Sequence, residues 1–135
     1  MRGQLSISYL PYLTQPDFDH LLWACDLNFV RGEDSLVRAL WAGKPFVWQL
    51  YPQEDGAHLN KLQAFLDWLQ APDELRQFHL VWNNAAPAET LRWPEANRLS
   101  EWQATVESAR ARLLGLPSLA EQLLNFVMQA LTQRN

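Results

Sequence analysis

Short apolar runs alternate with helical patterns in residues 1–56. Leu5–Leu10 alternates apolar and polar side chains, as a half-buried strand does, and Leu27–Val30 and Phe46–Leu50 are further short apolar runs. Between these runs, Asp17–Ala24 and Leu36–Ala42 place apolar residues at helical spacing. The order strand, helix, strand, helix, strand predicts three parallel strands joined by right-handed crossovers.

The remainder of the chain shows only the spacing of amphipathic helices. Four helices are predicted, over Ala57–Gln70, from Pro72 onward, over Ala96–Leu113 and after Pro117. An irregular segment that contains Pro87 and Pro94 separates the second of these helices from the third. We therefore expect one α/β domain, with a parallel β-α-β-α-β unit in residues 1–56 and a helical part in residues 57–135.

The stretch Asp26–Ser35 predicts a strand, a tight turn and the first turn of a helix. Gly32 permits a backbone turn that a residue with a β-carbon would resist, and Asp34 and Ser35 are residue types that favour helix starts. Parallel strands end on one edge of their sheet, and open α/β sheets bind ligands at that edge. The three segments that follow the strands would bring together Tyr12, Gln15, Arg31, Glu33, Asp34, Ser35, Tyr51, Gln53 and Asp55.

These side chains are suited to a phosphorylated sugar ligand. Arg31 and the backbone N–H groups of the following helix would hold a phosphate, carboxylates would accept hydrogen bonds from sugar hydroxyls, and tyrosine rings would flank a base or a sugar. A purely structural interpretation is also open. Asp34 and Ser35 would then simply cap the helix, and Arg31 would form a surface ion pair with Glu33 or Asp26, which stabilises little.

Composition narrows the class of protein. The chain has 135 residues, which is enough for one domain, and a net charge of −4, which argues against non-specific binding to nucleic acid. No apolar run is long enough to span a membrane, and the N-terminus lacks the apolar region of a secretory signal. We therefore expect a cytoplasmic protein without a membrane or nucleic-acid partner.

Cysteine and histidine give no sign of a metal site. The single cysteine, Cys25, excludes an internal disulfide and is expected to be a buried thiol. His20, His58 and His79 have no metal-ligand spacing, so we predict no bound metal. No glycine-rich dinucleotide or P-loop motif is present. Seven tryptophans are many for this length, and most are expected to pack in the core.

Three segments carry a resemblance to a known family. Leu10–Asp19, Leu22–Ser35 and Ala42–Gln53 closely resemble the bacterial elongation factor P arginine rhamnosyltransferases, and the similarity extends over the whole chain. The sequence Asn-Phe-Val-Arg-Gly-Glu-Asp-Ser, which ends at Ser35, is its most specific part. The family implies the GT-B architecture, in which two Rossmann-like domains enclose a cleft. One domain binds dTDP-β-L-rhamnose, and the other binds elongation factor P and supplies an essential aspartate.

The resemblance implies that this chain is the latter half of the donor domain, a Rossmann-like parallel three-layer unit with a helical C-terminal part. It implies an inverting transfer of rhamnose to an arginine, without a metal or a cofactor other than the donor. The implied catalytic residues are Glu33, Arg31 and Asp34, and the implied substrate-binding residues are Tyr12 and Gln15 beside the base, Ser35 near the diphosphate, and Tyr51.

The acceptor domain and the first donor-domain strands of that family have no counterpart in this sequence, so we expect the isolated chain to be inactive. Two alternatives remain open at this point. The chain would be part of another GT-B nucleotide-sugar enzyme, or it would be a non-catalytic helical interaction module whose tryptophan-rich surface binds a partner.

Overall fold

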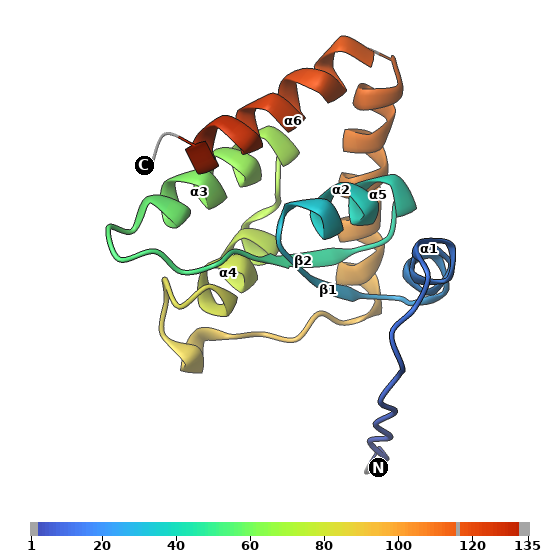
Figure 1. The fold of residues 1–135 in the computed structure, drawn as a ribbon. Coiled ribbons are helices and arrows are strands. Elements are labelled where there is room, and N and C mark those ends of the chain that lie inside the picture. Colours follow the sequence, from blue (N-terminus) through green and yellow to red (C-terminus); the bar gives the residue numbers. More distant parts are fainter. Residues whose placement is uncertain (1–2, 116, 133–135) are drawn as a thin grey trace.

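A computed structural model describes residues 3–115 and 117–132 of the chain. Two short strands lie at its centre and helices surround them (Figure 1). The elements are α1 (Gln15–Ala24), β1 (Asn28–Arg31), α2 (Glu33–Ala42), β2 (Phe46–Gln49), α3 (Ala57–Leu69), α4 (Asp73–Trp82), the 3₁₀ turn η1 (Ala88–Thr90), α5 (Ala96–Gly115) and α6 (Pro117–Thr132). None of the described helices is long and apolar enough to cross a membrane.

β1 and β2 form a parallel pair that α2 connects, in register from Asn28 opposite Phe46 to Arg31 opposite Gln49. Phe46, Val47 and Trp48 are all buried, which is typical of a parallel strand covered on both faces. The sequence therefore predicted the β1–α2–β2 unit correctly, and the described residues form an α/β fold with a small parallel sheet.

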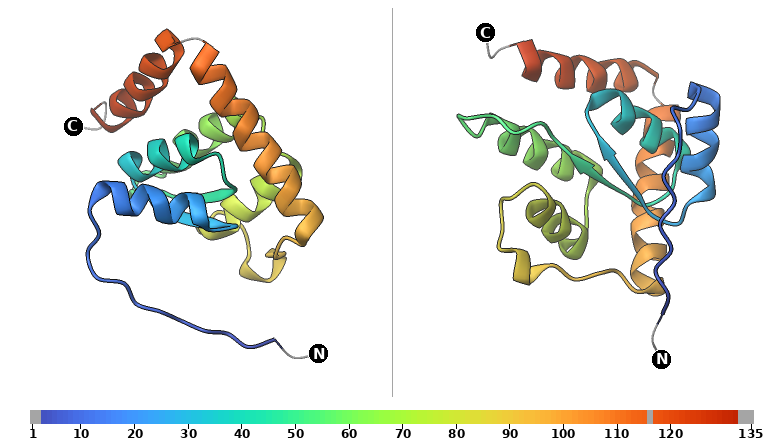
Figure 2. Two further views of the ribbon diagram at one scale, coloured as in Figure 1. Left: turned by 90° about the vertical axis from the view of Figure 1, so that its right-hand side faces the viewer. Right: turned by 60° about the horizontal axis from the view of Figure 1, so that its bottom comes forward.

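The predicted first strand, Leu5–Leu10, is not formed. Residues 3–14 make no strand and run outside the packed elements (Figures 1 and 2). Leu5 and Tyr9 are 88% and 94% exposed. Alternating side chains favour a strand only when a neighbouring edge supplies hydrogen bonds and a layer covers one face. Neither condition is met here, so the sheet has two strands instead of the expected three.

Side chains of α4 and of its C-cap residue form hydrogen bonds with the backbone at the outer edge of β2. The backbone N–H of Trp48 donates to His79 Nε2 at 3.0 Å, and the backbone N–H of Leu50 donates to Asn83 Oδ1 at 2.9 Å. Asn83 Nδ2 donates in return to the Trp48 carbonyl at 2.9 Å. An uncovered strand edge is a site for aggregation, and these bonds close it without a third strand.

The core joins both parts of the sequence. It is built from α2, β2, α3, α4 and α5, and its largest buried side chains are Trp48, Trp102, Phe46, Phe78, Leu36 and Leu40. Trp68 and Trp82 pack against this core, whereas Trp23, Trp41 and Trp93 are exposed. Cys25, which was expected to be buried, is only partly buried at the C-cap of α1.

His79 generates a pH-dependent prediction. Burial lowers the pKa of its imidazole from 6.5 to about 4, because the neutral ring accepts the Trp48 N–H in an apolar environment. The unfolded chain therefore binds a proton on this residue between pH 6.5 and 4, whereas the folded chain does not. His79 should reduce the free energy of unfolding by up to roughly 3 kcal/mol as the pH falls through this window.

The test is urea unfolding of the wild type and of His79→Gln at several pH values between 7 and 4. Glutamine can accept the Trp48 N–H but does not titrate, so the variant should lose less stability across the window. Parallel curves for the two proteins would contradict this assignment.

Candidate functional site

The turn between β1 and α2 is fixed by its bonds to β2. Gly32 N–H donates to the Gln49 carbonyl at 3.2 Å, and the indole Nε1–H of buried Trp48 donates to the Gly32 carbonyl at 3.0 Å. Gly32 has φ 82°, a left-handed conformation that glycine adopts without steric cost. The start of α2 is therefore held rigidly at the carboxyl end of the sheet.

Gly32 is the N-cap of α2, and within the described residues no side chain caps this helix. Asp34 and Ser35 lie inside its first turn and are not N-caps. A helix start leaves N–H groups without intrahelical partners, and these groups are suited to bind an anion. The capping interpretation of the two residues was therefore wrong.

Arg31 lies against Tyr51, which follows β2. Its guanidinium carbon is 4.6 Å from the centre of the tyrosine ring, a cation–π distance. A β-carbon on Gly32 would lie 3.4 Å from the same ring. Among the described residues Arg31 forms no ion pair, so the pairing with Glu33 or Asp26 considered from the sequence is not seen.

Glu33 has a partner that sequence reasoning missed. Its Oε1 accepts a hydrogen bond from Lys61 Nζ of α3 at 3.1 Å, and this lysine is only 6% exposed. One signal was available, because Lys61 shares a helical face with Phe65 and Trp68 at spacings of four and seven residues. A lysine on the apolar face of a helix requires a buried partner.

Arg38 of α2 forms hydrogen bonds with three polar side chains from α1 and α2. Its guanidinium donates to both carboxylate oxygens of Asp19 at 2.9 and 2.8 Å, to Gln15 Oε1 at 2.6 Å and to Asp34 Oδ2 at 3.3 Å. The hydrogen bonds that Arg38 donates to Asp19 raise the pKa of Arg38 above its usual value. Sequence reasoning missed Arg38 and Asp19, although Arg38 lies four residues after Asp34 on one helix, a spacing that favours ion pairs.

An open groove of about 460 Å³ lies beside these groups. Its lining includes four of the residues predicted from the sequence, and the full set is Pro11, Tyr12, Leu13, Gln15, Phe18, Leu21, Asp34, Ser35 and Arg38. The other three predicted residues, Arg31, Glu33 and Tyr51, do not line it. The residues that line the groove and those that do not are adjacent at the start of α2, where Glu33 is followed directly by Asp34 and Ser35.

The loop after β2 was expected to bring Gln53 and Asp55 to the site, but both residues form hydrogen bonds at the start of α3. Asp55 Oδ1 accepts the backbone N–H of Ala57 at 3.1 Å and so supports the start of α3. The backbone N–H of Gln53 donates to His58 Nδ1 at 3.1 Å, and its side-chain Oε1 is buried without a hydrogen-bond partner among the described residues.

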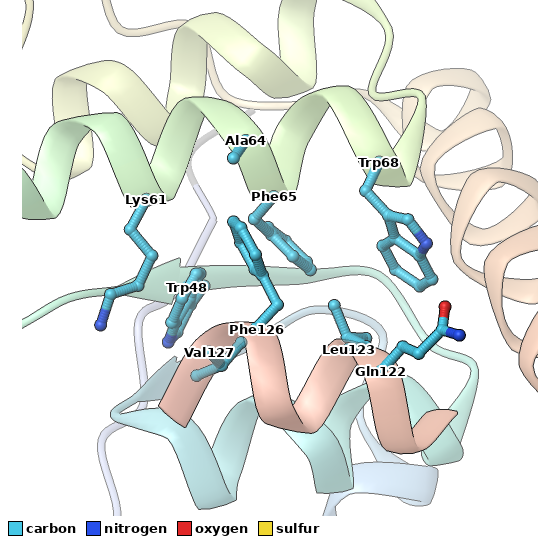
Figure 3. Close-up of a pocket in the computed structure, with 9 residues that line it drawn as sticks. All are labelled: Trp48, Lys61, Ala64, Phe65, Trp68, Gln122, Leu123, Phe126 and Val127. Atoms are coloured by element: carbon cyan, nitrogen blue, oxygen red, sulfur yellow. The ribbon is translucent and has the colours of Figure 1, made fainter. Parts of the chain in front are cut away.

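A second cavity, of about 320 Å³, lies between α3 and α6 (Figure 3). Its lining is predominantly apolar and consists of Trp48, Lys61, Ala64, Phe65, Trp68, Gln122, Leu123, Phe126 and Val127. Two of these lining residues also reach the start of α2, because Trp48 bonds to Gly32 in the turn and Lys61 bonds to Glu33, the first residue of the helix. The described part of the chain contains no cluster of three metal-ligating side chains.

The family model described as "Elongation-Factor P (EF-P) rhamnosyltransferase EarP" matches residues 1–128. The chain belongs to this family. The chain is 42% identical over 133 residues to the protein-arginine rhamnosyltransferase of Pseudomonas aeruginosa, an alignment that covers 93% of this chain and 35% of that protein. It is 37% identical over 131 residues to the enzyme of the same name from Neisseria meningitidis, with 87% and 34% covered.

A solved EarP structure agrees with these relatives. It comes from work titled "Structural basis for EarP-mediated arginine glycosylation of translation elongation factor EF-P", and it superposes with a TM-score of 0.64 at 34% identity. The superposition covers 88% of this chain and 39% of that one. The chain thus spans about a third of the length of the curated EarP relatives it matches.

Replacement of Trp48 by phenylalanine should weaken the turn that starts α2. The variant loses the donor to the Gly32 carbonyl as well as part of a buried ring, so we expect it to lose about 2 kcal/mol or more of stability. Trp102→Phe is a matched control, because Trp102 is equally buried but its Nε1 has no partner among the described residues.

Urea unfolding of both variants measures the contribution of the hydrogen bond. Trp48→Phe should cost about 1 kcal/mol more than Trp102→Phe, which is the usual net value of one such bond. An equal loss in the two variants would show that the indole bond does not stabilise the turn.

Proposed function

We propose that this chain is the donor-binding part of an inverting protein-arginine rhamnosyltransferase that takes dTDP-β-L-rhamnose and modifies elongation factor P. The observation that carries the proposal is the charge balance at the start of α2. Both acids there are paired, Glu33 with Lys61 and Asp34 with Arg38, a guanidinium that Asp34 shares with Asp19. Arg31 beside them has no carboxylate partner among the described residues, and the helix start has no side-chain cap.

This arrangement suits the leaving diphosphate of a nucleotide sugar. The N–H groups of α2 and the guanidinium of Arg31 would stabilise the negative charge that develops as the sugar bond breaks. Cation–π contact with Tyr51 holds Arg31 in place without neutralising it. Ser35, in the same helical turn, would add a hydroxyl donor.

The groove beside α2 would hold the nucleoside. Arg38 donates to Gln15 Oε1 at 2.6 Å, and this bond fixes the amide so that its NH₂ group can donate to a carbonyl of the base. Tyr12 is fully exposed at the rim, and its ring would stack on the base or the sugar. Asp34 would accept hydrogen bonds from sugar hydroxyls.

In the proposed reaction, a guanidine nitrogen of the acceptor arginine forms a bond to the anomeric carbon. The bond from that carbon to the diphosphate oxygen breaks, the configuration inverts, and the attacking nitrogen passes one proton to a carboxylate as its new bond forms. Arginine stays protonated at neutral pH, so hydrogen bonds that it donates to carboxylates are better suited to activate it than full removal of its proton beforehand. Glu33 is the carboxylate of this chain that we assign to that task.

The acceptor side of the site would come from polypeptide that this chain does not contain. In the proposal, this polypeptide completes a Rossmann-like three-layer donor domain, supplies the facing domain of a GT-B enzyme and binds elongation factor P. No metal or separate cofactor takes part. Because the acceptor is a translation factor, the reaction belongs in the cytoplasm.

The chain should bind thymidine diphosphate, and Arg31→Ala should weaken that binding by about 10- to 100-fold, because it removes a charge-assisted hydrogen bond to phosphate. Isothermal titration calorimetry measures both values. Arg76→Ala is the matched control, because Arg76 pairs with Asp67 between α3 and α4, away from this turn, and should change nothing.

Equal affinity of the wild type and Arg31→Ala would overturn the proposed site. Tighter binding of a uridine diphosphate sugar than of dTDP-rhamnose would favour a different GT-B enzyme. Absence of any nucleotide binding would favour the interaction module.

The isolated chain should bind the donor but transfer no rhamnose to elongation factor P, because the proposed facing domain that would hold the acceptor arginine is not part of it. Mass spectrometry of elongation factor P incubated with the chain and dTDP-rhamnose measures transfer as a mass increase. Modification at rates comparable to those of a full-length relative from the family would contradict the division of labour proposed here.

A further inference from the structure

Lys61 has an unusual position for a lysine. It comes from the middle of α3, and its neighbours on that face, Phe65 and Trp68, line the apolar cavity beneath α6. Figure 3 shows its side chain extending from α3 past the ring of Trp48. The ammonium ends 3.1 Å from Glu33 Oε1, which belongs to a residue 28 positions earlier in the chain.

Stability alone does not account for this pair. The desolvation of two charges offsets most of their attraction, and well-packed apolar residues of similar volume are often as stable or more stable. Methionine would suit a position lined by Trp48, Ala64 and Phe65. A buried lysine at this position instead points to a function at the other end of the ion pair, at the first residue of α2.

That end is where the proposed diphosphate site lies. A carboxylate at the first position of a helix competes with a bound anion for the same N–H groups, and two acids stand there in succession. Arg38 holds Asp34 on the exposed part of the turn, and Lys61 holds Glu33 from the interior. The interior cation is screened less by solvent and salt than the exposed one.

We propose that Lys61 is a positioning residue for this site: its buried ammonium fixes the Glu33 carboxylate and offsets its charge, so that the start of α2 accepts the diphosphate of the donor. The role rests on the proposed function, because it acts through Glu33 and needs a donor at α2. Lys61 itself does not touch the donor.

A pair of variants separates this role from direct contact. Lys61→Met keeps the length and the apolar stem of the side chain but leaves Glu33 unpaired, so thymidine diphosphate should bind roughly tenfold more weakly through like-charge repulsion. Lys61→Met combined with Glu33→Gln removes both charges, and its affinity should return to within about threefold of the wild type. Lys61→Arg should retain most of the affinity, because it keeps a cation opposite Glu33.

Calorimetry measures the affinity of each variant for thymidine diphosphate, and the melting temperature of each variant shows whether it is folded. Unchanged affinity in Lys61→Met would overturn the proposal. A double variant that binds as weakly as Lys61→Met would also overturn it, because that result would mean that Lys61 contacts the diphosphate directly. If the wild type itself binds no thymidine diphosphate, the proposed function fails first, and the role of Lys61 fails with it.

A second measurement requires no change at Lys61. The ¹⁵N resonance of a buried, ion-paired lysine ammonium should be visible in the wild type because its protons exchange slowly with water. Glu33→Gln should shift this resonance or broaden it. An unchanged resonance would show that the two side chains are not coupled, and this would overturn the proposal independently of any nucleotide binding.

Discussion

The candidate site depends on the position of one short turn. The chain leaves β1 at Arg31, reverses through Gly32 and enters α2 at once, and β2 holds this path through the Gln49 carbonyl and the Trp48 indole. Trp48 in turn is fixed by the core around it and by His79, which accepts its backbone N–H. The buried packing of β2 and α4 is thus transmitted through a few hydrogen bonds to the start of α2, where the charged groups gather.

The charged groups at the start of α2 include acids as well as bases, and each acid is paired with a base. Glu33 and Asp34 would repel a phosphate if they were free, but each is held by a basic residue from a different direction. The cation that remains without a carboxylate among the described residues is Arg31, which rests on Tyr51. In the proposed site, balanced charges would allow acids to stand where sugar hydroxyls and an acceptor guanidinium need them, while the start of α2 accepts the diphosphate.

Local patterns predicted those parts of the structure that local interactions decide. The spacing of apolar residues predicted β1, α2, β2 and the later helices, and the motif around Gly32 marked the turn. Leu5–Leu10 failed because a strand depends on a partner edge that its own sequence does not contain. The partners Lys61, Arg38 and Asp19 were missed for the same kind of reason. Each meets the predicted residues only after α1, α2 and α3 have packed, and single-sequence spacing does not describe that contact.

The elements that contribute to the proposed site suggest which of its proposed steps this chain would perform by itself. Among the described residues, the contacts that order the start of α2 come from β2, which bonds to the turn, from the interior cation of α3 and from the outer cation of α2 itself. In the proposed reaction, the acceptor arginine is held by groups that face Glu33 from across a cleft. The proposed donor binding and the proposed transfer are thus separable in physical terms, because the first depends on a turn whose contacts lie within the described residues.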